Sequence, residues 1–195
     1  MVILALDQAT LTGYAVVNEN GLIHESGTWL LADRKRTGES RGMRYIRFEA
    51  ELRKIMGRWR PELVVHEQTL LRGGAATEIA NGLKAIILKV AAERDTEVSC
   101  VHTSELKHWA TGSGKAEKED MVRAATGFLK CHSEAGKAVP DDDNEADAIC
   151  IGLWAAERYG AFQGPHWPEK KTTPKRKKRS PGSFLDELHV PDGPF

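Results

Sequence analysis

The chain has 195 residues, with 28 lysines and arginines against 28 aspartates and glutamates, 41% hydrophobic residues and 29% charged residues. This length fits one ordinary domain, alone or with a tail, and the apolar fraction is high enough to build a core. Wholesale disorder is therefore excluded, and the apolar start at residues 1–6 is too short for a membrane span or a signal peptide. We expect a soluble protein of the cytoplasm with no membrane partner.

The cysteines argue against two kinds of stabilised fold. Their number is odd and no two are spaced as CxxC: they are Cys100, Cys131 and Cys150. A disulfide framework and a structural zinc site both need more cysteines in closer pairs. We interpret the adjacent Cys131 and His132 as an ordinary core or surface pair.

Charge is segregated along the chain although the total is zero. Residues 161–195 carry seven lysines and arginines against four acids, so residues 1–160 are slightly acidic. We predict one domain over residues 1–160 and a flexible basic tail, containing proline and glycine, over residues 161–195. Residues 34–60 hold ten basic residues against three acids, which could form a patch facing phosphates or a solvated helix face.

The first elements read as strands. Residues 2–6 are an unbroken apolar run that ends at Asp7, as expected of a strand buried on both faces. Residues 14–17 and 22–31 read as two further strands joined by a turn at Asn20-Gly21. These three strands are predicted to form an antiparallel meander.

Helices and strands alternate in the rest of the domain. Helical spacing covers about residues 38–59 and stops at Pro61, and a short strand at residues 63–66 runs into Glu67. A helix at 75–94, a strand at 98–102, a short helix from Ser104 and helices at 117–129 and 143–159 follow. The sequence predicts an α/β fold: a five-stranded mixed sheet, with a three-stranded antiparallel meander and two parallel strands, flanked by helices.

Four acidic residues fall at the ends of predicted elements: Asp7, Glu67, Asp143 and Asp147. Strand ends at one edge of an open sheet converge, and residues four apart on a helix point the same way. Carboxylates gathered in one cleft repel each other unless a hard cation such as Mg²⁺ or Mn²⁺ neutralises them. Taken singly, an aspartate after a strand is usually a turn former, and aspartates before a helix are usually N-caps. Glu67 favours the metal site, because an unpaired charge near the middle of a sheet is costly.

Four motifs in order resemble the RuvC-type Holliday-junction resolvases over about residues 2–158. They are Asp7 with Thr12-Gly13-Tyr14-Ala15-Val16-Val17, then His66-Glu67-Gln68, then Lys107 with Thr111-Gly112-Ser113-Gly114-Lys115-Ala116-Glu117-Lys118, then Glu145-Ala146-Asp147-Ala148. The resemblance implies a ribonuclease H-like fold, a homodimer and Mg²⁺-dependent cleavage of four-way DNA junctions. A basic extension on a short body is similar to phage-borne members of this bacterial family.

The resemblance also implies roles for individual residues. Asp7, Glu67 and Asp147 match the family's first, second and last acids. Many family members have an Asp three residues before the last acid, where this chain has Asn144, and relatives with paired aspartates also use the position four before, which is Asp143 here. Of these two positions, we assign the fourth metal ligand to Asp143, with Asn144 beside it as a neutral helper. The family's two-ion hydrolysis, which uses Mg²⁺ or Mn²⁺, would leave 5′-phosphate and 3′-hydroxyl ends. Lys118 matches a catalytic lysine near the scissile phosphate.

Two departures from the family pattern concern the backbone and the DNA. Ala9 replaces a usual glycine, so its backbone must avoid positive φ. Leu70 or Leu71 replaces an aromatic side chain that follows the second acid, so an apolar wedge would remain without ring stacking.

The predicted DNA-binding residues are all basic: Arg36, Arg41, Arg72, Lys107, Lys115 and Lys118. Each is otherwise explained as a solvated lysine or arginine. The Gly112-Ser113-Gly114-Lys115 stretch is not a nucleotide-binding P-loop, because Trp109 and Ala116 occupy positions where that motif needs glycine and a hydroxyl residue.

Three alternatives to a junction resolvase remain at this point. A ribonuclease H-like nuclease acting on flaps or RNA–DNA hybrids would use the same acids. A sugar-kinase-like ATPase would need a second lobe, which about 160 residues do not supply, and a non-catalytic DNA-binding scaffold would not need the acids. The apolar residues of the helix at 75–94 would serve either a dimer interface or the chain's own core.

Overall fold

A mixed five-stranded sheet forms the centre of the computed structural model, which describes residues 1–32, 40–68, 74–134 and 136–165. The strands are β1 (Val2–Asp7), β2 (Leu11–Asn18), β3 (Ile23–Leu30), β4 (Leu63–Glu67) and β5 (Glu97–Val101), in the spatial order β3-β2-β1-β4-β5. β1, β2 and β3 pair antiparallel, whereas β4 pairs parallel with β1 and β5 pairs parallel with β4. The predicted meander and the two parallel strands are confirmed.

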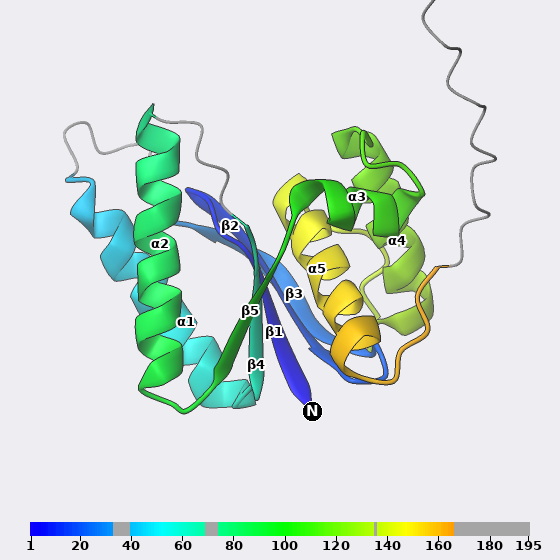
Figure 1. The fold of residues 1–195 in the computed structure, drawn as a ribbon, viewed down its shortest axis with the longest axis horizontal. Coiled ribbons are helices and arrows are strands. Elements are labelled where there is room, and N and C mark those ends of the chain that lie inside the picture. Colours follow the sequence, from blue (N-terminus) through cyan, green and yellow to red (C-terminus); the bar gives the residue numbers. More distant parts are fainter. Residues whose placement is uncertain (33–39, 69–73, 135, 166–195) are drawn as a thin grey trace, which may run out of the picture.

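Five helices cover the sheet on both faces (Figure 1). α1 (Gly42–Trp59) and α2 (Gly74–Ala92) pack on one face. α5 (Asp143–Tyr159) lies directly on the other face, and α3 (Thr103–Thr111) and α4 (Lys118–His132) lie outside α5. α5 is buried along most of its length because it is packed between the sheet and α4.

The alternation of side chains along the strands divides the core in two. Val64 of β4 belongs to the cluster under α1 and α2, and its neighbour Val65 belongs to the cluster under α3, α4 and α5. Such strands are apolar on both faces, which explains the unbroken apolar runs in the sequence.

The observed elements differ from the predicted ones mainly at their ends. β2 extends over Leu11–Asn18, beyond the predicted residues 14–17, because Thr12 is fully buried and Gly13 pairs with Asp7. α1 ends at Arg60, which adopts a left-handed conformation just before Pro61. The predicted turn contains Gly21 at φ 79°, a conformation that glycine adopts at no steric cost.

The segment after α5 contacts the turn that follows β2. The backbone N–H groups of Ala161 and Phe162 both donate to the carbonyl of Glu19, and Phe162 packs against the core beneath α5. The predicted tail lies, from residue 166 on, outside the described residues. Among the described helices, none is long and apolar enough to cross a membrane.

Candidate active site

Asp7 and Glu67 lie side by side at one edge of the sheet. They end the neighbouring parallel strands β1 and β4, whose register pairs Leu6 with His66 one residue earlier. The carboxyl ends of parallel strands form the usual ligand-binding edge of an open sheet. The structure therefore brings together the two strand-end acids that the sequence singled out.

A close backbone contact brings the start of α5 to the same edge. Gly13 pairs with Asp7 across the sheet, and a Cβ atom on Gly13 would lie 1.9 Å from the carbonyl oxygen of Asn144. Only glycine leaves room for the first turn of α5 to approach β2 this closely. That turn carries Asp143, and Asp147 follows four residues later on the same side of the helix.

The electrostatics show that the four carboxyl groups act on one another. Burial raises the pKa of Asp7 well above its usual value, and the nearby charges of Glu67, Asp147 and Asp143 raise it further. Burial and the charge of Glu67 raise the pKa of Asp147 to about 7, although Lys107 opposes this shift. We call Asp7, Glu67, Asp143 and Asp147 the acidic group.

The acidic group has the chemistry of a site for a hard cation. Among the described residues, Asp147 Oδ1 is buried and has no hydrogen-bond partner, which is costly for a carboxylate oxygen. A divalent ion would satisfy this oxygen and cancel the repulsion that raises the carboxyl pKa values. The residues present therefore fit a divalent metal.

Two members of the acidic group hold protein donors in this structure. The Thr103 hydroxyl at the start of α3 donates to Glu67, and the Lys118 ammonium at the start of α4 pairs with Asp143 and lowers its pKa. In the described part of the chain, no group of three or more histidine, cysteine, aspartate or glutamate side chains forms a ready-made metal site. Thr103 has no motif around it, so sequence reasoning missed this contact.

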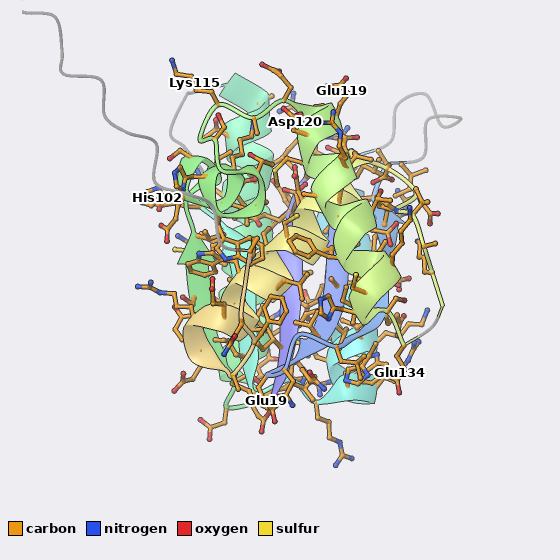
Figure 2. The ribbon with its side chains drawn as sticks, turned by 90° about the vertical axis from the view of Figure 1, so that its right-hand side faces the viewer. Glu19, His102, Lys115, Glu119, Asp120 and Glu134 are labelled. Atoms are coloured by element: carbon orange, nitrogen blue, oxygen red, sulfur yellow. The ribbon has the colours of Figure 1, made fainter. Side chains whose placement is uncertain are left out.

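Two predicted DNA-binding lysines, Lys107 and Lys118, interact with the acidic group. Lys107 is half-buried, and its ammonium donates to the carbonyl of Ala116 at 2.7 Å while it acts electrostatically on Asp147. Lys118 and Lys115 are exposed. Figure 2 shows Lys115 near the start of α4, at the opposite end of the domain from Glu19. A polyanion reaching the acids would therefore meet cations on the α3 and α4 side.

The basic stretch at residues 34–60 is only partly available for DNA. Arg53 pairs with Glu49 and Glu93, and Arg58 pairs with Glu25, so these helix arginines bind acids of the domain itself. Arg41 is exposed and lies 3.6 Å from Glu78. Arg36 and Arg72, with Leu70 and Leu71, lie outside the described residues.

The apolar side of α2 mostly serves the chain's own core. Leu83, Ile87 and Val90 are fully buried against the sheet and α1.

The expectation at Ala9 is confirmed, because Arg60 and Asp95 are the only non-glycine residues with positive φ in the described ranges.

Comparisons with known proteins agree with this arrangement. The family model described as crossover junction endodeoxyribonuclease RuvC matches residues 3–154. A RuvC of Prochlorococcus marinus subsp. pastoris is 26% identical over 151 residues, which cover 76% of this chain and 90% of that relative.

Solved structures share the fold. The Thermus thermophilus RuvC structure has a TM-score of 0.65 at 24% identity, covering 81% of this chain and 96% of that one. T. thermophilus RuvC in complex with a Holliday junction substrate has a TM-score of 0.64 at 24% identity, covering 80% and 93%. The fold is thus the ribonuclease H-like fold of these resolvases. With its family model matched over most of its length, the chain belongs to the RuvC family of crossover junction endodeoxyribonucleases.

Proposed function

We propose that this protein is a metal-dependent endonuclease that resolves four-way and related branched DNA, leaving 5′-phosphate and 3′-hydroxyl ends. The observation that carries the proposal is the acidic group, in which strand ends 60 residues apart and the first turns of α5 hold mutually repelling carboxyls. RuvC family membership supports the choice of branched DNA over flaps or RNA–DNA hybrids.

The acidic group would hold the metal, Mg²⁺ with Mn²⁺ as a substitute, as two ions per site. Bound there, the ions would activate a water molecule and stabilise the leaving 3′ oxygen. Besides burial, the charges of Glu67, Asp147 and Asp143, in that order, raise the pKa of Asp7, so Asp7 interacts with all three other acids. This interaction suits a bridging ligand. Glu67, Asp143 and Asp147 would complete the ligand set.

The lysines around the site would bind and orient the DNA. Lys118 is exposed at the start of α4 and already contacts Asp143, so it would lie beside a phosphate bound at the acids and stabilise developing negative charge. Lys107, Lys115, Arg36, Arg41 and Arg72 would bind the backbone of the junction, an interaction that weakens steeply with salt. A homodimer, as the RuvC resemblance implies, would present two sites to one junction and cut it in pairs.

A substrate panel tests the proposal. Purified protein is incubated with labelled four-way junction, flap, duplex and RNA–DNA hybrid, each with Mg²⁺ and with a chelator. With Mg²⁺ and not with chelator, we expect symmetric, ligatable nicks in the junction, slower cutting of the flap, and none of duplex or hybrid at the same enzyme concentration. If flaps or hybrids were cut preferentially, they and not the junction would be the substrate. Cutting in the presence of the chelator would show that the reaction needs no metal.

Asp7→Asn is the matched variant for this panel. The change keeps the size of the side chain but removes the charge that would bridge two cations. We expect Asp7→Asn to bind the junction with an affinity close to that of the unchanged protein and to leave it uncut. Full cleavage by this variant would contradict the assignment of the site.

A further inference from the structure

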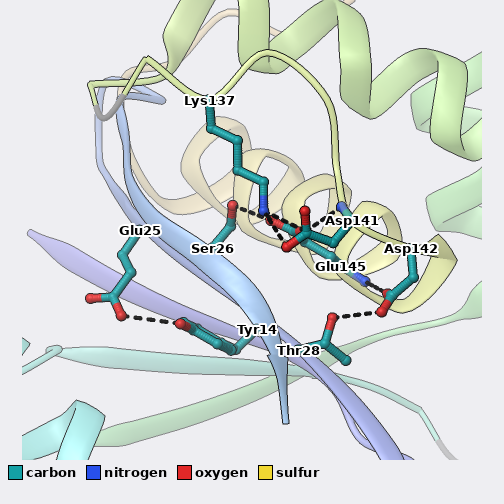
Figure 3. Close-up of polar contacts among 8 residues, drawn as sticks. All are labelled: Tyr14, Glu25, Ser26, Thr28, Lys137, Asp141, Asp142 and Glu145. Carbon is teal, nitrogen blue, oxygen red and sulfur yellow. Dashed lines mark hydrogen bonds and ion pairs between the residues drawn. The ribbon is translucent and has the colours of Figure 1, made fainter.

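An ion pair joins Glu145, which lies on α5 between the two helix aspartates of the acidic group, to Lys137 in the segment before this helix. Glu145 is fully buried, and both of its carboxylate oxygens accept from the Lys137 ammonium, at 2.7 and 2.8 Å. The Ser26 hydroxyl of β3 donates to the same carboxylate at 2.6 Å, and so does the backbone N–H of Asp141, also at 2.6 Å. Figure 3 shows these groups converging between β3 and the start of α5.

A second contact joins β3 to α5 at the N-cap of the helix, three residues before Glu145. The Asp142 side chain caps α5 by accepting from the Glu145 backbone N–H at 2.9 Å, and it also accepts from the Thr28 hydroxyl at 2.8 Å. Ser26 and Thr28 are two residues apart on β3 and therefore point to the same face of the sheet. We call Ser26, Thr28, Lys137, Asp141, Asp142 and Glu145 the β3–α5 network.

The network fixes the part of α5 that carries the metal-site acids. Asp143 precedes Glu145 by two residues and Asp147 follows it by two, so all three lie within about one turn of a rigid helix. At about 100° per residue, Glu145 points away from both aspartates. A displacement of Glu145 along β3 would therefore move Asp143 and Asp147 with it, although neither belongs to the network.

The pair is an expensive way to hold a helix end if stability were its only role. Burying the Glu145 carboxylate fully and the Lys137 ammonium partly costs desolvation that their attraction only partly returns, and apolar side chains of similar size often serve as well. A charged pair with several hydrogen bonds does, however, admit one geometry, whereas an apolar contact tolerates sliding. A metal site needs ligands held to fractions of an ångström.

We propose that Lys137 and Glu145, tied to β3 through Ser26 and Thr28, are positioning residues that set Asp143 and Asp147 for metal binding. This inference rests on the proposed function of the acidic group. It assigns the network no contact with DNA or metal. Its effect is on how well the acids bind a cation and on the rate of cleavage, and not on how the junction is bound.

The test compares Lys137→Met with Lys137→Arg and with a matched control elsewhere. Lys137→Met keeps the apolar stem and removes the ammonium, and Lys137→Arg restores a cation. Arg53→Met removes a cation from the ion pairs with Glu49 and Glu93 on the other face of the sheet. For each folded full-length variant, Mn²⁺ affinity is measured by electron paramagnetic resonance, and kcat and KM are measured on a four-way junction.

We expect Lys137→Met to weaken Mn²⁺ binding and lower kcat by about 10-fold or more each, the range known for residues that orient metal ligands. The KM for the junction stays within about 2-fold, because the network does not touch DNA. Lys137→Arg recovers most of both losses, and Arg53→Met changes neither. Wild-type Mn²⁺ affinity and kcat in folded Lys137→Met would overturn the inference.

Thr28→Val keeps the test decisive if Lys137→Met does not fold. It removes one hydroxyl from the network without leaving a buried charge, and it keeps the β-branched shape that suits a strand. We expect several-fold weaker Mn²⁺ binding by Thr28→Val, and an unchanged affinity would overturn the inference. Mn²⁺ affinity is measured without DNA, so it separates failure of this inference from failure of the junction substrate.

Discussion

Two carboxylates on the first turns of α5 stand in opposite environments. Glu145 faces β3, is fully buried, and accepts hydrogen bonds from an ammonium, a hydroxyl and a backbone N–H. Asp147 faces the edge of the sheet, where one oxygen is buried without a partner among the described residues and burial raises its pKa to about 7. One carboxylate is satisfied by the protein, and the other is left for a ligand.

This difference separates the groups that hold the fold from the groups that serve function. A buried charge with hydrogen-bond partners favours one conformation of the chain. A set of carboxylates that repel each other lowers the stability of the fold, and a bound cation would restore it. The two kinds of carboxylate lie within one rigid helix, so the satisfied one can orient the unsatisfied one. Four changes, taken from the largest expected effect to the smallest, test this distinction.

Asp147→Asn is expected to have the largest effect, and on activity alone. If Asp147 is a metal ligand as proposed, removing its charge should lower the cleavage rate on a four-way junction by about 1,000-fold, since the reaction would rely on the cation that it holds. The free energy of unfolding in chelator should not fall, because the change removes repulsion. Rate assays and urea titrations measure the two quantities, and an active or strongly destabilised Asp147→Asn would contradict the distinction.

Glu145→Ala is expected to lower the free energy of unfolding, in addition to the loss of metal binding expected for a positioning residue. It leaves the Lys137 ammonium and the Ser26 hydroxyl without their carboxylate and opens a cavity in the core, for a loss of about 3 kcal/mol in the free energy of unfolding. Urea titration at neutral pH measures this loss. Glu49→Ala is the matched control, because the pairs of Glu49 with Arg53 and Lys89 are screened by water, so this change should cost much less stability than Glu145→Ala. Equal losses in the two variants would remove the special status of Glu145.

The pH dependence of stability should distinguish the unsatisfied carboxylate in chelator. Because the pKa of Asp147 is raised to about 7 in the folded chain, the native state binds more protons than the unfolded state between about pH 4 and 7. Stability from this group is therefore lost as pH rises through that window. Relative to Asp147→Asn, the unchanged protein should lose on the order of 2 kcal/mol between pH 5 and pH 8. If the free energies of unfolding of the two proteins changed equally with pH, the pKa of Asp147 would not be raised in the folded chain.

The fold could be predicted from the sequence because the buried strands have unbroken apolar runs. Unbroken apolar runs such as residues 2–6 belong to strands covered on both faces, and the structure has such strands at the centre of the sheet. Strand ends were less predictable, because Gly13 has low strand propensity, and burial of Thr12 and the close contact of Gly13 with α5 set the start of β2. Tertiary packing, and not local preference, sets those ends.

The acidic group was predictable from the sequence, but its supports were not. Glu67 is conspicuous, because a carboxylate that directly follows a buried apolar strand is costly unless it is paired. The partners of those acids come from distant segments: Thr103 reaches Glu67 across 36 residues, and Ser26 reaches Glu145 across 119. The spacing of Asp142 and Glu145, that of a helix capping box, was the one local signal of the β3–α5 network.

Lys118→Met is expected to have the smallest effect on stability, and it completes the comparison with Lys137. Both lysines pair with a carboxylate in the first turn of α5, but the Lys118 side chain is 77% exposed and that of Lys137 is 27% exposed. Water screens the exposed pair, so Lys118→Met should change the free energy of unfolding by about 0.5 kcal/mol or less. Urea titration of both methionine variants measures the contrast. The two pairs differ mainly in burial. If Lys118→Met lowered the free energy of unfolding as much as Lys137→Met does, the strength of the β3–α5 network would come from its place at the start of α5 and not from desolvation.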